Sequence, residues 1–127
     1  MTIRGHSTFN NPTPVSTTSA TAVQALLIDV VTLGVNNCGF RAEGVLIGKE
    51  TSTNKVVSLA FSATFGVVSG TLTQHGSTGF SGNGDASLTT CVPTLAVSAN
   101  KVQLTVAGVA GKTITWTAHL DIFTAEQ

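Results

Sequence analysis

A strict two-residue alternation of apolar and polar side chains constrains the fold of this chain more than any other feature. Over residues 57–67 the apolar positions are Val57, Leu59, Phe61, Ala63, Phe65 and Val67, and over 114–122 they are Ile114, Trp116, Ala118, Leu120 and Ile122. Successive side chains of a β-strand point to opposite faces, so this period predicts strands with one buried face. We place five of these residues in the predicted core: Phe61, Phe65, Ile114, Trp116 and Leu120.

Further apolar runs between turn signals bring the expected total to about eight strands. We expect these strands over residues 22–33, 40–49, 71–74 and 86–92, and on both sides of a tight turn at Asn100-Lys101. Residues 22–33 also fit helical spacing, but their β-branched side chains favour a strand. Short strands at this spacing are typical of a single antiparallel β-sandwich or jelly-roll-like domain. The predicted fold class is therefore all-β.

Composition narrows the possible partners. The chain has 127 residues, the size of one domain, and only 9% of them are charged, with a net charge of zero. No Lys/Arg cluster is present to neutralise phosphates, so we expect no nucleic-acid binding. The apolar stretch 22–35 is interrupted by Gln24 and Asp29, so we expect no membrane span. Few charges oppose lateral contacts, which favours self-association.

Residues 1–20 differ from the rest and are rich in Ser, Thr, Asn and Pro. Ile3, Phe9 and Val15 are six residues apart, so an extended chain would turn all three to one side. We interpret 1–20 as an extended arm that grips a neighbour through Ile3, Arg4, Phe9 and Val15, and 21–127 as the sandwich domain. The alternative is a tail with three chance hydrophobic residues.

No pattern of reactive residues predicts chemistry. The histidines (His6, His75 and His119) lack metal-ligand spacing, and the acidic residues are scattered along the chain: Asp29, Glu43, Glu50, Asp85, Asp121 and Glu126. Glycoside hydrolysis needs paired carboxylates, so this scatter argues against it. Cys38 and Cys91 are either buried apolar residues or a disulfide pair. We expect no enzymatic activity, no metal and no cofactor.

Two aromatic residues are candidates for binding. The glycine-rich segment 75–85 predicts a flexible loop with Phe80 at its tip. Phe80 would either fold back over the end of the sheet or stand exposed as an anchor for a partner. Trp116 lies on an alternating strand, which favours a core position over a binding platform.

The segment LTVAGVAGKTITWTAHLDI, residues 104–122, resembles a pattern in small structural proteins and fibre domains of tailed bacteriophages. In that pattern a V-x-G-x-A-G-x-T-I-x-W run turns a hairpin and sends a final strand into the core. The matching residues here are Val106, Gly108, Ala110, Gly111, Thr113, Ile114 and Trp116. The chain lacks a long shaft and coiled-coil heptads, which favours a short capsid-bound protein over a fibre.

The resemblance implies a virion structural protein, assembled in the host cytoplasm. Within this class we first expect a capsid decoration (cement) protein that binds the major capsid protein or another virion protein and forms a homotrimer. One alternative is a tail-fibre tip or receptor-binding module. A second is a carbohydrate-binding domain, for which Phe80 is the one aromatic residue expected at the surface.

Overall fold

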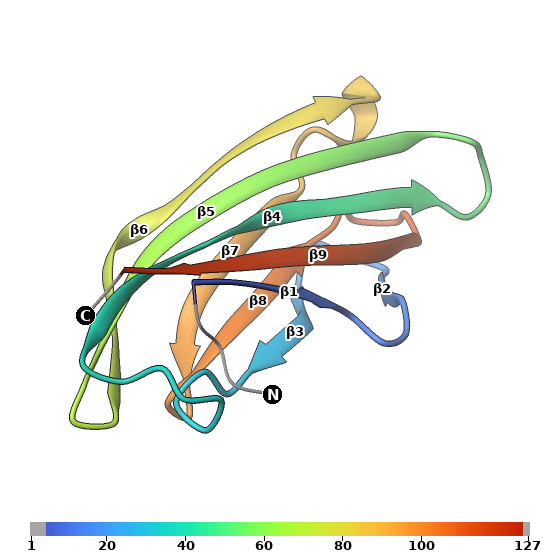
Figure 1. Ribbon diagram of the computed structural model, residues 1–127. Helices are drawn as coiled ribbons and strands as arrows, with labels where there is room; N and C mark the ends of the chain where they lie inside the picture. The colour runs from blue at the N-terminus through green and yellow to red at the C-terminus, as the bar shows by residue number, and fades with distance from the viewer. Residues whose placement is uncertain (1–4, 126–127) are drawn as a thin grey trace.

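Two antiparallel sheets pack face to face in the computed structural model, which describes residues 5–125 (Figure 1). The strands of the large sheet lie in the order β1-β9-β4-β5-β6, with β2 also paired to β9: β1 His6–Asn10, β2 Val15–Thr17, β4 Cys38–Glu50, β5 Val56–Val68, β6 Thr71–Gly84 and β9 Ile114–Thr124. The small sheet has the order β3-β8-β7: β3 Ala22–Ile28, β8 Lys101–Ala107 and β7 Val92–Ser98. Nine strands and one 3₁₀ turn, η1 (Ala86–Leu88), make up this part of the chain. The predicted β-sandwich is confirmed.

The core lies between the sheets and follows the alternation of the sequence. Every second residue of β5 from Val57 to Val67 is buried, as is every second residue of β9 from Ile114 to Ile122. All five residues assigned to the core are at most 3% exposed: Phe61, Phe65, Ile114, Trp116 and Leu120. Phe40 and Phe65 add an edge-to-face ring contact, with centroids 5.3 Å apart.

The segment that carries the phage-like pattern crosses between the sheets. β8 belongs to the small sheet and β9 to the large one, so residues 108–113 connect the two layers instead of turning a hairpin. Gly111 has a positive φ of 77°, which glycine adopts at low cost. A Cβ at Gly108 would clash with Thr17 Oγ1. That hydroxyl accepts a hydrogen bond of 3.0 Å from Trp116 Nε1, so Gly108, Thr17 and Trp116 form one packed corner.

The expectation of a separate N-terminal arm is wrong for residues 6–17. β1 pairs with β9 from His6↔Phe123 to Asn10↔His119, and β2 pairs with the same strand from Val15↔Trp116 to Thr17↔Ile114. The segment is extended, but it lies along a strand of its own chain. Its backbone groups complete the ladder of β9, which would otherwise form the edge of the large sheet. Ile3 and Arg4 lie outside the described residues.

The glycine-rich segment 75–85 is not a loop over most of its length. β6 continues through it to Gly84, paired with β5 from Ser62↔Gly79 to Val57↔Gly84. A bulge interrupts the register between Ser62 and Thr64 of β5. The strand expected at 86–92 is wrong, because these residues form η1 and a turn before β7 begins at Val92. The turn between β7 and β8 is centred on Ala99 and Asn100, which both have a positive φ. The side chain of Asn100 joins this turn to the β5–β6 turn by accepting from Leu72 N and donating to Gly70 O.

Candidate functional site

The outer face of the large sheet, the face turned away from the small sheet, carries charged, apolar and small side chains. In β4 the buried Phe40, Ala42 and Leu46 alternate with Arg41, Glu43, Val45 and Ile47, which face outward. The register brings one outward row across five strands: Thr8, Asp121, Glu43, Ser62 and Gly79. Period-two patterning therefore assembles this face from segments that are far apart in sequence.

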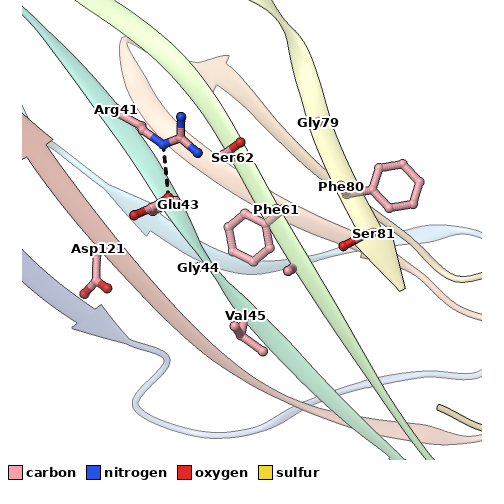
Figure 2. A pocket seen from close by; sticks show the side chains of 11 residues that line it. Arg41, Glu43, Gly44, Val45, Phe61, Ser62, Gly79, Phe80, Ser81 and Asp121 are labelled. Atoms are coloured by element: carbon pink, nitrogen blue, oxygen red, sulfur yellow. Dashed lines mark hydrogen bonds and ion pairs between the residues drawn. The ribbon is translucent and has the colours of Figure 1, made fainter. Parts of the chain in front are cut away.

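A hollow of about 580 Å³ lies across this face, over β9, β4, β5 and β6 (Figure 2). The outward positions of β5 and β6 in it carry small residues: Ala60, Ser62, Gly79 and Ser81. Larger side chains of β4 and β9 also line it, namely Arg41, Glu43, Val45 and Asp121. The depression follows from this difference in side-chain size. It is open to solvent and offers both apolar and hydrogen-bonding groups.

Hydrogen bonds fix the charged groups beside the hollow. Arg41 Nε donates to Glu43 Oε2 at 3.0 Å, the contact drawn in Figure 2. Asp121 Oδ1 accepts from Thr8 Oγ1 at 2.7 Å and lies 3.4 Å from His6 Nε2. These pairs are partly exposed, so they contribute at most about 1 kcal/mol each to stability. Their main effect is to orient the side chains.

An aromatic stack extends the same cluster toward one end of β9. The rings of His6 and Phe123 lie with centroids 4.6 Å apart and planes 4° from parallel. Phe123 is the register partner of both His6 and Arg41. Polar, charged and aromatic groups therefore adjoin one another along β1, β9 and β4.

The structure brings together two carboxylates that are scattered in the sequence. Glu43 and Asp121 are direct partners in the β4–β9 ladder. Residues directly opposite in an antiparallel pair have Cβ atoms about 5 Å apart. The alternation of each strand places its acid on the outer face, but only the pairing of β4 with β9 makes them neighbours. That pairing has no local sequence signal.

This arrangement is suited to binding a polar surface. Both carboxylates already accept hydrogen bonds from neighbouring side chains, and the hollow is open rather than closed around them. Arg41 offers further N–H donors, and the hydroxyls of Ser62 and Ser81 act as donors or acceptors. A ligand or protein surface could therefore form several hydrogen bonds along one row of the sheet.

The residues assigned to the arm and the loop have different positions from those expected. Phe9 and Val15 are half-buried and pack against the core of their own domain. Phe80 lies on β6 opposite Phe61 and is 48% exposed. Its ring extends away from β5, beyond the border of the sheet (Figure 2). The structure thus leaves Phe80 available to a partner, but on a strand edge.

Residues 5–125 contain no group of three or more His, Cys, Asp or Glu side chains placed to hold a metal ion. Asp85 caps η1, accepting from Ser87 N at 2.9 Å and Ser87 Oγ at 2.6 Å. The hydrogen bond from the Ser87 hydroxyl lowers the pKa of Asp85. Cys38 and Cys91 are free thiols, and burial raises the pKa of Cys91. This part of the chain also contains no helix long and apolar enough to cross a membrane.

No protein-family model and no curated protein sequence matches the chain. Among solved structures, it is similar to the tailspike protein of Acinetobacter baumannii phage AM24, with 10% sequence identity and a TM-score of 0.48. The match covers 94% of this chain and 25% of that tailspike chain. The chain therefore spans about a quarter of the tailspike's length.

Proposed function

We propose that this protein is a structural component of a bacteriophage virion that binds a virion surface through the outer face of its large sheet. Within that class we propose capsid decoration, with the major capsid protein or another virion protein as partner. The observation that carries the proposal is the hollow on the outer face, about 580 Å³ in volume. The phage-like run at residues 104–122 supports the choice of a virion protein.

The chemistry of the outer face fits adhesion to protein. Ile47 and Val56 are each 44% exposed on it, although both are strongly apolar. Exposed apolar side chains next to oriented polar groups mark interaction surfaces. Binding to an assembled shell, but not to free subunits, would stabilise the shell by mass action. This proposed function requires no catalytic step.

Recognition of a host receptor is a second candidate, favoured by the row of hydrogen-bonding groups along the hollow. Arg41, Glu43 and Asp121 present charged donors and acceptors beside the Ser62 hydroxyl. Saccharide hydroxyls would pair with such groups. Under this alternative the protein belongs to a fibre tip or another receptor-binding module, and its partner is a surface glycan.

Co-sedimentation separates the two candidates. Purified protein is mixed with empty phage capsids, with tails, or with host cells, and the bound fraction is measured against concentration. Capsid decoration predicts saturable binding to capsids and none to cells. Binding to cells that is removed by competing saccharide would instead establish the receptor-binding alternative.

The homotrimer expected from the sequence remains a prediction. It concerns the protein assembled on the shell, so chemical cross-linking of capsid-bound protein measures the oligomeric state. A trimer on the capsid would support this prediction, whereas any other state there would contradict it.

A further inference from the structure

The sandwich has four strand edges, and three of them are protected. The β1/β2 edge is interrupted by Pro12 and Pro14, and β3 has a register shift between Gln24 and Leu26. β7 carries Pro93, and the Thr78 hydroxyl accepts from Leu95 N and donates to Leu95 O. Prolines, irregular register and covered backbone groups all prevent one sheet edge from pairing with another.

The fourth edge, residues 79–84 of β6, lacks these devices. The sequence GFSGNG has no charged residue and no proline, and all six residues are exposed. In Figure 1, β6 forms the free upper border of the large sheet. The bulge that bends β6 comes before this segment, so the segment keeps a continuous register with β5 up to Gly84, whose φ of 143° marks the end of the strand.

The register shows which backbone groups point outward. Asp85 N donates to Val56 O at 3.0 Å, which makes Val57 and Gly84 a pair without mutual hydrogen bonds. Because hydrogen-bonded and non-hydrogen-bonded pairs alternate along an antiparallel ladder, Phe80 and Gly82 also lack hydrogen bonds to their partners in β5. The N–H and C=O groups of Phe80, Gly82 and Gly84 therefore point away from β5, toward the open side of the sheet.

We propose that residues 79–84 pair antiparallel with the same segment of a second copy, about a two-fold axis at Gly82. The backbone N–H and C=O groups of Gly82 would form hydrogen bonds with those of Gly82 in the other copy. The same groups of Phe80 would form hydrogen bonds with those of Gly84 in the other copy. Phe80, Gly82 and Gly84 share one face of β6, so each exposed Phe80 ring would lie over a glycine of the other copy. A glycine leaves room for the ring.

The segment is also electrostatically compatible with itself. Pairing about Gly82 places Asp85, the nearest charged residue in sequence, opposite Gly79 of the second copy, so no like charges face each other. A two-fold contact uses the same surface patch on both copies and closes on itself. The two large sheets would then form one continuous sheet. The proposal does not depend on what the outer face binds, although Gly79 and Ser81 of the paired segment also line the hollow.

The mass of the protein in solution, measured by light scattering over a range of concentration, tests the proposal. We expect a dimer that Phe80→Lys weakens by about tenfold or more, because the change removes an anchor and adds like charges. Phe123→Lys is the matched control, since Phe123 is an exposed aromatic residue on the same sheet and away from β6. Circular dichroism verifies that both variants fold. A monomer at all concentrations, a trimer, or a dimer unaffected by Phe80→Lys would overturn the proposal.

Oxidative cross-linking tests the register without relying on a loss of stability. A two-fold axis at Gly82 places Ser81 opposite Asn83 of the other copy, in the closely spaced type of pair. A mixture of Ser81→Cys and Asn83→Cys proteins should therefore cross-link more than either variant alone. Wild-type protein controls for Cys38 and Cys91. No excess of cross-linking in the mixture would contradict this register.

Discussion

At the scale of single residues, the corner made by Gly108, Thr17 and Trp116 accounts for two residues of the phage-like run, Gly108 and Trp116. Trp116 is fully buried, and Thr17 is 1% exposed and bonded to its ring nitrogen. Gly108 leaves the space that Thr17 occupies. The ring of Trp116, the hydroxyl of Thr17 and the absence of a side chain at Gly108 depend on one another. The effects of substitutions at these three positions on the free energy of unfolding should therefore not be additive.

Trp116→Ala should give unfolded or insoluble protein. Removing a buried Trp costs about 3 to 5 kcal/mol, while a small domain is stable by about 5 to 15 kcal/mol. Thr17→Val tests the hydrogen bond alone and should cost about 1 to 3 kcal/mol, because it leaves the indole N–H unpaired. Thermal melts measure both effects. A soluble Trp116→Ala protein with an unchanged melting temperature would contradict the buried position.

Acid should destabilise the protein through Asp29 and Asp85. The hydroxyls of Thr32 and Ser87 lower the pKa values of these carboxyls below the ordinary 3.8. The folded state therefore binds fewer protons than the unfolded state near that pH. The stabilisation is complete above the ordinary pKa and is lost as the pH falls through the lower folded values.

The measurement is the melting temperature from pH 7 downward, for wild type and for Asp29→Asn with Asp85→Asn. The double variant should have a flatter profile on the acid side. Identical profiles would show that these two turns do not account for the acid response.

At the scale of elements, the alternating strands could be predicted and the strands without alternation could not. β5 and β9 alternate over their whole length, so the sequence defines both the strand and its buried face. β6 is composed largely of Gly, Ser and Thr, and its extended form depends on pairing with β5. Strand propensity is low for glycine, so the sequence alone predicts a loop there.

The N-terminal strands and the cluster on the outer face depend on distant pairing. Thr8 and Asp121 form a hydrogen bond across 113 residues of sequence. Glu43 and Asp121 likewise meet only because β4 and β9 are neighbours. No local pattern specifies which strands lie side by side, so neither the placement of residues 6–17 nor the paired carboxylates could be derived from the sequence.

Deletion of residues 1–17 should destabilise the domain strongly. The truncation removes both strands that pair with one side of β9 and the hydroxyl that Trp116 bonds. It also leaves β9 as an exposed edge, which favours aggregation. Thermal melting and light scattering measure the two effects. A soluble truncated protein with the wild-type melting temperature would restore the interpretation of this segment as a separate arm.

At the scale of the whole molecule, the two sheets differ in what their outer faces offer. The large sheet carries the hollow, the oriented charged groups and the exposed Ile47 and Val56. On the outward side of the small sheet, Gln103 donates to Gln24, next to Leu27, which is 40% exposed. The proposed function therefore assigns binding to one side of the sandwich and leaves the other side free.

Capsid binding by two matched variants tests this assignment most directly. Ile47→Asp places a charge on the outer face of the large sheet, and Leu27→Asp places the same charge at a similarly exposed position on the small sheet, 44% against 40%. Both should fold with similar melting temperatures. We predict that Ile47→Asp weakens co-sedimentation with capsids by about tenfold or more, whereas Leu27→Asp binds like wild type. Equal binding by the two variants, or a loss confined to Leu27→Asp, would contradict the account.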